Sequence, residues 1–295
     1  MTNWITISSG ALTARINPVG AELSSLVDAD GRELMTDADP AFWTGRAPLL
    51  FPIVGRLAGD ELRVDGKAHP IKQHGFARRA MFRVVAVTDD QAVFELTDSA
   101  ETRAAYPFAF RLVATYTLDA ATLTIDIGIQ NPGNTPLPAS FGFHPAFAWP
   151  LPYGHPREAH RIVFAQDEPA RVKRLEGGLF AGDRASPLEG RTLALSDALF
   201  ADDALVWIGV RSQSVRYGAD TGPQLEIAFP DTPDLGIWSK PVPAGTQGAR
   251  FVCIEPWHGH ADLVGFAGDF RDKPGVFEVP PGGEKWLGMS VTLVG

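Results

Sequence analysis

The sequence FRLVATYTL at residues 110–118 is followed, after a short turn, by LTIDIGI at residues 123–129. In both runs apolar and polar side chains alternate, which puts the apolar ones on one face of an extended chain. Two such runs joined by a short turn predict an antiparallel hairpin with one buried face. This stretch therefore indicates a protein built from sheets.

The same pattern continues on both sides of this hairpin. Residues 80–87 and 91–96 flank the turn dipeptide Asp89-Asp90. Shorter runs flank Asp65-Gly66, a dipeptide that favours a two-residue hairpin turn. Further strands are predicted at residues 62–64, 67–69, 205–210, 225–229, 251–254 and 286–293.

Helical signals are sparse by comparison. Asp98, with Glu101 three residues later, predicts a capped turn that ends before Pro107. Residues 150–187 are rich in Pro, Gly and charge, which predicts excursion loops. No shift in composition divides the chain. We therefore predict one all-β domain over residues 1–295, with many antiparallel strands in packed sheets and very little helix.

Composition narrows the possible functions. The 295 residues carry 26 basic and 35 acidic side chains, a formal net charge of -9, and no dense Lys/Arg run, so nucleic-acid binding is not expected. No apolar stretch approaches the ~20 residues that cross a bilayer, and the first residues do not read as a signal peptide. A single cysteine, Cys253, excludes an intramolecular disulfide. We expect a cytoplasmic protein without a membrane partner.

Three short phrases carry titratable groups beside Gly, Pro or aromatic residues. They are KQHGFAR around His74, FGFHP around His144 and CIEPWHG around Glu255. An imidazole acid and a carboxylate base can open a pyranose ring, because one protonates the ring oxygen while the other takes the proton of the anomeric hydroxyl. Aromatic walls suit the apolar faces of a sugar. The phrases therefore favour a sugar-converting acid–base enzyme.

Each of these residues, taken alone, also has a purely structural interpretation. Glu255 precedes Pro256, which cannot continue a sheet ladder, so we expect the carboxylate at a strand end, where it could simply cap a turn. His144 could be a packed core histidine, and His74 a turn residue at a strand start. Arg46 and Arg56 could bind sugar oxygens or be ordinary surface charges.

Two further patterns suggest other chemistry. His258, His260 and Asp262 alternate, as metal ligands on one face of a strand would, but Gly259 makes a regular strand doubtful there. Cys253 lies within an apolar run, where cysteine usually packs as a small apolar side chain. We predict no metal site.

The three phrases, in this order, resemble the aldose 1-epimerase (galactose mutarotase-like) superfamily, and most of all its LacX-like branch. The resemblance spans nearly the whole chain. Besides the three phrases it includes NPVGAEL at residues 17–23, FPIVGR at 51–56, YPF at 106–108, Asn131, FPD at 229–231 and GIWSKP at 236–241.

This resemblance implies a large antiparallel β-supersandwich and interconversion of α and β anomers without a cofactor. It implies that Glu255 is the general base and His144 the general acid, with His74 binding sugar oxygens. Asp203, with Asp202 close behind, matches an aspartate that binds sugar hydroxyls, and Trp238 is expected to form a wall. The expected partner is a small-molecule sugar, bound by a monomer or homodimer.

The chain also departs from typical galactose mutarotases. Residues 57–60 read Leu-Ala-Gly-Asp, where an Asn-Arg pair is usual, and Arg56 and Arg46 are the candidates to compensate for its loss. Gln73 and Arg78 resemble residues that contact substrate in hexose-6-phosphate epimerases, although the Arg-Gly-Gly element of that branch is missing upstream. A non-catalytic carbohydrate-binding protein on the same scaffold is a further alternative. A glycoside hydrolase ranks below it, because most use two carboxylates.

Overall fold

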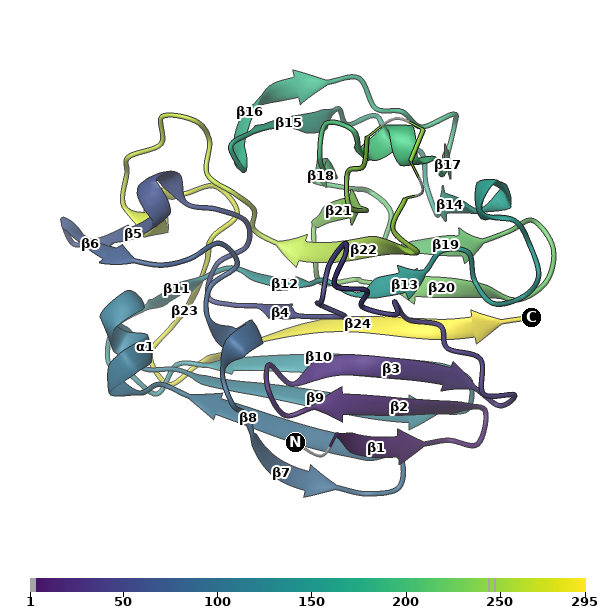
Figure 1. The fold of residues 1–295 in the computed structure, drawn as a ribbon. Helices are drawn as coiled ribbons and strands as arrows, with labels where there is room; N and C mark the ends of the chain where they lie inside the picture. Colours follow the sequence, from purple (N-terminus) through teal and green to yellow (C-terminus); the bar gives the residue numbers. More distant parts are fainter. Residues whose placement is uncertain (1–3, 244, 247) are drawn as a thin grey trace.

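The fold, described by a computed structural model, is built almost entirely from antiparallel sheets (Figure 1). The structure describes residues 4–243, 245–246 and 248–295. A nine-stranded sheet has the order β17-β14-β19-β20-β24-β10-β9-β8-β7. An eight-stranded sheet has the order β16-β15-β18-β21-β22-β12-β4, with β13 pairing β22, and β1-β2-β3 form a separate sheet. The predicted all-β fold is confirmed.

The strands of the nine-stranded sheet are β7 (Arg83–Val87), β8 (Gln91–Thr97), β9 (Arg111–Asp119), β10 (Thr122–Gln130), β14 (Arg161–Phe164), β17 (Thr192–Ala194), β19 (Ser214–Gly218), β20 (Gln224–Ala228) and β24 (Glu284–Val294). Those of the eight-stranded sheet are β4 (Leu49–Leu50), β12 (Phe141–Phe143), β13 (Ala146–Ala148), β15 (Val172–Glu176), β16 (Leu179–Arg184), β18 (Leu205–Ile208), β21 (Asp234–Trp238) and β22 (Phe251–His258). The small sheets contain β1 (Ile5–Ser8), β2 (Leu12–Asn17), β3 (Glu22–Asp28), β5 (Glu61–Val64), β6 (Lys67–Pro70), β11 (Leu137–Ala139) and β23 (Phe277–Val279). The helical segments are α1 (Ala100–Ala105) and the 3-10 turns η1 (Ala58–Asp60), η2 (Ala77–Arg79), η3 (Arg157–Ala159), η4 (Asp197–Phe200) and η5 (Phe270–Asp272).

The hairpin at residues 110–129 lies near the centre of the nine-stranded sheet. Its register pairs Tyr116 with Ile125 and Ala114 with Ile127, so the apolar sets of both strands share one buried face. The sheet β1-β2-β3 packs nearby, and the hydroxyl of Tyr116 donates a hydrogen bond to the carbonyl of Ala21. Alternation thus predicts both the pairing and the face that enters the core.

The shorter hairpins also form where the sequence predicts them. Asp65 and Gly66 both have positive φ, 51° and 73°, as a two-residue turn between β5 and β6 requires. The strands β7 and β8 pair around residues 88–90. Among the described residues, no helix is long and apolar enough to cross a membrane.

Two local predictions are wrong. The cap of α1 is Ser99, whose side chain accepts a hydrogen bond from the backbone N–H of Thr102. In return, the side-chain hydroxyl of Thr102 accepts the backbone N–H of Ser99. Asp98 instead accepts the N–H of Phe110 and pairs with Arg103, so its carboxylate is engaged elsewhere and does not cap the helix. The second error concerns residues 150–187, which contain β14, β15 and β16 as well as loops. These strands were missed because they are short and charged on their exposed side.

Candidate active site

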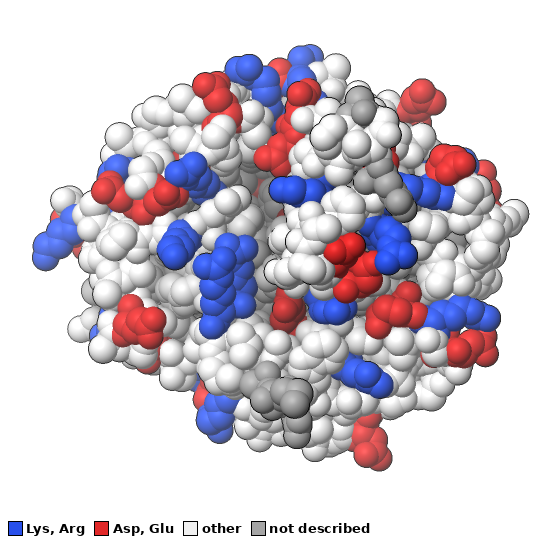
Figure 2. All heavy atoms as spheres, in the orientation of Figure 1, with Lys and Arg blue, Asp and Glu red and all other residues white. Residues whose placement is uncertain are grey.

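One pocket brings together almost all of the predicted site residues. Its volume is about 1250 Å³. Figure 2 shows a hollow near the middle of one face, with Lys and Arg side chains along its rim. The predicted residues that line the pocket are His74, His144, Glu255, Arg56, Gln73, Arg78, Asp203 and Trp238.

Glu255 lies inside β22 and not at its end, which corrects the prediction made from Pro256. Pro256 occupies a ladder position opposite Leu235 of β21. On its other side β22 pairs first with β13 and then with β12, and the ladder is interrupted between those two strands at residues 144–145. A residue without an N–H therefore fits this gap. Alternation along β22 puts Cys253, Glu255 and Trp257 on one face.

His144 sits in that interruption, directly after β12. Its Nε2 atom lies 3.2 Å from Oε2 of Glu255, and both side chains are buried. The ring of Trp43 stacks on the imidazole at 4.9 Å with an interplanar angle of 25°, and Trp238 meets it edge-on at 6.1 Å. Trp43 was missed by the sequence analysis, because its loop has no distinctive motif and only the fold brings it here.

His74 is held in an uncommon backbone conformation. Its φ is 66° and that of Gly75 is 68°. A side chain at Gly75 would place Cβ 2.2 Å from the carbonyl oxygen of Phe51, so glycine is required there. Nδ1 of His74 accepts the N–H of Gly55 at 3.2 Å. Nε2 must therefore carry the proton when the ring is neutral, and can act as a hydrogen-bond donor.

Burial controls the charge of these three groups. It raises the pKa of Glu255 well above its usual value, and the nearby charge of Asp203 adds to this effect. It lowers the pKa of His144 to about 3 and that of His74 well below its usual value, with His144 and Arg78 contributing to the shift at His74. These shifts favour a neutral carboxyl group on Glu255 beside a neutral imidazole on His144. One proton moved across the 3.2 Å contact gives a carboxylate base and an imidazolium acid.

The ring of Trp257 explains glycines in two of the quoted motifs. A Cβ on Gly142 would lie 2.5 Å from Cδ1 of this indole, and one on Gly236 would lie 2.6 Å from its Cη2 atom. Gly142 and Gly236 belong to the strands on either side of β22. The indole therefore lies across three strands and lines the pocket beside Glu255.

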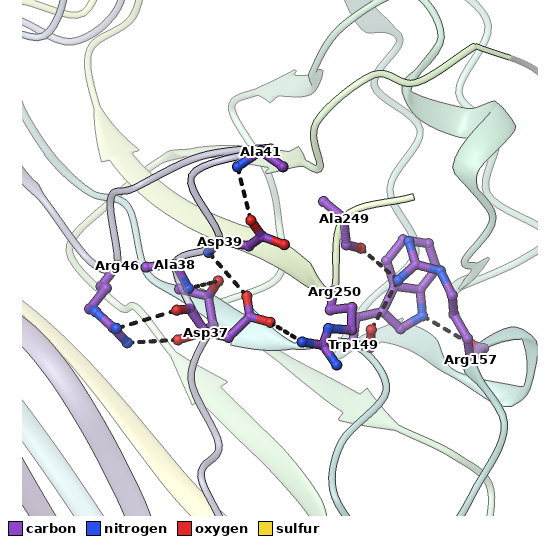
Figure 3. Close-up of polar contacts among 10 residues, drawn as sticks. Asp37, Ala38, Asp39, Ala41, Arg46, Trp149, Arg157, Ala249 and Arg250 are labelled. Carbon is purple, nitrogen blue, oxygen red and sulfur yellow. Dashed lines mark hydrogen bonds and ion pairs between the residues drawn. The ribbon is translucent and has the colours of Figure 1, made fainter. Parts of the chain in front are cut away.

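The two arginines considered as replacements for the Asn-Arg pair differ in position. Arg56 lines the pocket, but its Nε and Nη2 atoms bind Asp60 at 2.7 and 2.8 Å and its Nη1 donates to the carbonyl of Gly177. Arg46 is not among the lining residues. Its guanidinium donates to the carbonyls of Thr36 and Asp37 in a different polar cluster (Figure 3).

Arg78 is better placed than either of them to meet a ligand. It lines the pocket, donates from Nη2 to the carbonyl of Gln73, and has a buried Nε without a partner among the described residues. Asp203 has a positive φ of 74°, in the turn that follows η4. Asp202 also lines the pocket and pairs with Arg184.

The hairpin β15–β16 forms a further part of the wall. It contributes residues that the sequence analysis assigned to loops. These residues are Arg174, Leu175, Gly177, Gly178, Phe180 and Arg184. The hydrogen bond from Arg56 to the carbonyl of Gly177 joins this hairpin to the segment that precedes η1.

His260 and Asp262, two of the three alternating residues considered as metal ligands, contact different parts of the protein. His260 Nδ1 contacts Asp234 at 3.1 Å, and Asp262 accepts the N–H of Ala58. A different set, His144, Cys253 and Glu255, has donor atoms within 4.8 Å of one another. A zinc-bound histidine normally gives its other N–H to a neighbouring acceptor, whereas Nδ1 of His144 has no partner among the described residues. The set therefore fits acid–base chemistry better than a structural metal site.

Comparison with known proteins agrees with this geometry. Residues 3–273 match the family model described as aldose 1-epimerase. The plasmid-encoded protein LacX of Lactococcus lactis subsp. lactis is 31% identical over 288 residues, which cover 94% of this chain and 95% of the relative. A galactose mutarotase related enzyme from Lactobacillus acidophilus is 34% identical, with a TM-score of 0.90 and coverage of 99% and 97%. A galactose mutarotase-like protein from Lactobacillus casei is 29% identical, with a TM-score of 0.91 and coverage of 99% and 100%.

The chain thus belongs to the aldose 1-epimerase family, a family of isomerases that act on sugars. Within this family, its similarity to the LacX proteins places it in the LacX-like branch.

Proposed function

We propose that the protein is an aldose 1-epimerase that interconverts the α and β anomers of a hexose or a related sugar without a cofactor. The observation that carries the proposal is the buried pair of His144 Nε2 and Glu255 Oε2, 3.2 Å apart in a pocket with tryptophan walls. An acid and a base at this spacing can serve the ring oxygen and the anomeric hydroxyl, which share one carbon atom.

The reaction would proceed in two proton transfers and their reversal. Glu255, as carboxylate, takes the proton of the anomeric hydroxyl, while His144, as imidazolium, gives a proton to the ring oxygen and the bond between C1 and that oxygen breaks. The aldehyde then rotates about the C1–C2 bond. Reclosure from its other face, with both protons returned, gives the opposite anomer. His74, a neutral donor at Nε2, would bind a sugar oxygen during these steps.

Polarimetry tests this proposal directly. Freshly dissolved α-glucose and α-galactose are followed to equilibrium with and without the protein. Faster equilibration that is lost in His144→Asn would support the proposal. Binding of either sugar in calorimetry without any acceleration would instead favour the non-catalytic sugar-binding protein.

The charge of the pocket favours a phosphorylated hexose as a second candidate substrate. Six basic side chains line the pocket against four acidic ones, although the whole chain carries a formal charge of -9. Two of the six pair with Asp60 and Asp202, and the other four have no ion-pair partner among the described residues. Those four are Lys72, Arg78, Arg174 and Lys240. Excess positive charge in a cleft attracts an anionic substrate.

The two substrates are separated by comparing α-glucose with α-glucose 6-phosphate in the same assay. For the phosphorylated sugar, Lys72→Gln and Lys240→Gln should raise KM and reduce its dependence on salt, with kcat little changed. Lys67→Gln, on the exposed strand β6 and outside the pocket lining, is the matched control. Equal KM values in all variants would exclude this second candidate.

A further inference from the structure

Trp257 has a polar atom that the proposed reaction has not yet used. Its side chain is 6% exposed, and the buried Nε1–H has no hydrogen-bond partner among the described residues. An unpaired buried donor costs stability, so native proteins rarely keep one without a reason. Trp257 lines the pocket and lies two residues along β22 from Glu255, on the same face of the strand.

The surrounding strands fix the indole. Gly142 and Gly236 leave room for the ring on both sides. A Cβ at either position would lie only 2.5–2.6 Å from an atom of the indole, which is a clash. A ring held in this way loses little freedom when it forms a bond, which is the condition for a preorganised donor. Two glycines inside strands, each of which costs stability, thus make room for the indole beside β22, the strand that carries the proposed base.

We propose that Trp257 is a positioning residue whose indole N–H donates a hydrogen bond to the Glu255 carboxylate once that group has lost its proton. The inference rests on the proposed function. A donor at this point stabilises the carboxylate and holds it toward the anomeric hydroxyl while His144 is engaged with the ring oxygen. The indole is close enough to the carboxyl group to favour its ionised form, against the rise in the pKa of Glu255 that burial and Asp203 cause.

Several other titratable or charged groups face the same carboxyl group or its partner. His144 approaches Glu255 from the segment after β12, Asp203 acts on it from the turn before β18, and Cys253 is its neighbour on β22. The charge of Arg78 acts on His144.

The test is Trp257→Phe, which keeps an aromatic ring and removes the N–H. The pKa of Glu255 should rise, and its ionisation removes the proton that Glu255 and His144 share, so the alkaline limb of the profile of kcat/KM against pH should move up by about one pH unit. At neutral pH kcat should fall about 10-fold, the usual loss for one bond to a charged group, with little change in KM. Trp286→Phe, which alters an exposed tryptophan of β24, is the matched control.

Two kinetic outcomes would overturn the inference, and two further cases call for a different measurement. An unmoved alkaline limb would overturn it, and an increase in KM with an unmoved limb would assign the N–H to the sugar instead. If Trp257→Phe does not fold, an analogue with sulfur in place of the indole N–H keeps the ring shape and answers the same question. If the wild-type protein is inactive, the proposed function fails, and the ¹³C shift of the Glu255 carboxyl carbon against pH still tests the bond.

Discussion

The substitution Glu255→Gln probes both the chemistry and the burial of the proposed base. Glutamine has the same size, and its amide can still donate to Nε2 of His144 across the 3.2 Å gap, so the pocket should keep its shape. The variant cannot accept the proton of the anomeric hydroxyl. Loss of a general base usually lowers the rate by about 10²- to 10⁴-fold, which is about 3–5 kcal/mol in the barrier. Sugar binding should change much less.

The same variant should also change the dependence of stability on pH. The folded pKa of Glu255 is raised, so the folded and unfolded states are both protonated at this site below the unfolded pKa, and no penalty arises there. As the pH rises above 4.5, the usual pKa of a glutamate side chain, the unfolded state ionises first and wild-type stability falls, until the folded pKa is reached. The slope is about 1.4 kcal/mol per pH unit. Glutamine does not titrate and escapes this loss.

This difference can be followed by thermal unfolding. A chain of 295 residues has an unfolding entropy of about 0.6 kcal/mol/K, so the Tm of Glu255→Gln should gain about 2 °C on the wild type for each pH unit above the unfolded pKa. His74 and His144 are present in both proteins, and their contributions cancel to first order. Tm is measured from pH 4 to 8, and mutarotation by polarimetry at neutral pH. A constant Tm difference would refute the burial argument, and a wild-type rate would refute the assignment of the base.

Two further substitutions test the surroundings of the site. Asp203→Asn removes a charge that raises the pKa of Glu255, so the alkaline limb of kcat/KM should move to lower pH; a shift to higher pH, measured by polarimetry, would contradict this. Gly75→Ala combines a left-handed backbone with a Cβ 2.2 Å from the carbonyl oxygen of Phe51, and should cost about 2–5 kcal/mol in thermal unfolding. Gly154→Ala, also left-handed but with open space around its Cβ, should cost only about 1–2 kcal/mol, and equal losses would argue against the clash.

Much of the fold follows from short-range patterns. Alternation over residues 110–129 predicts the face that is buried, because a strand has a period of two and one misplaced register would expose the whole apolar set. Asp65-Gly66 likewise predicts its turn, since the positive φ angles needed there suit these residues. The prediction that His74, His144 and Glu255 belong to one site rests on the resemblance to the family. The fold places all three in one pocket.

Other features depend on neighbours that are distant in sequence. Pro256 lies inside a strand only because the adjacent ladder is interrupted beside it, and nothing local to Pro256 reveals that gap. Trp43 reaches His144 from a loop, and Arg46 is drawn away by carbonyls of residues 36–37. The catalytic and binding roles of all these residues stay predictions until the variants are measured.

In this fold, the residues proposed to transfer protons and part of the wall that contacts the substrate lie in different segments, and the hairpin β15–β16 supplies only the wall. The proposed acid and base are fixed by β12 and β22 inside a sheet, whereas this hairpin pairs with the rest of that sheet at a single register position, Val172 with Trp207. Changes in its length or sequence can therefore alter which sugars fit without displacing the proton-transfer pair. Relatives with a common ancestor can thus diverge in substrate selectivity through changes in this hairpin alone. A chimaera that exchanges the hairpin between two relatives is a direct route to engineering that selectivity.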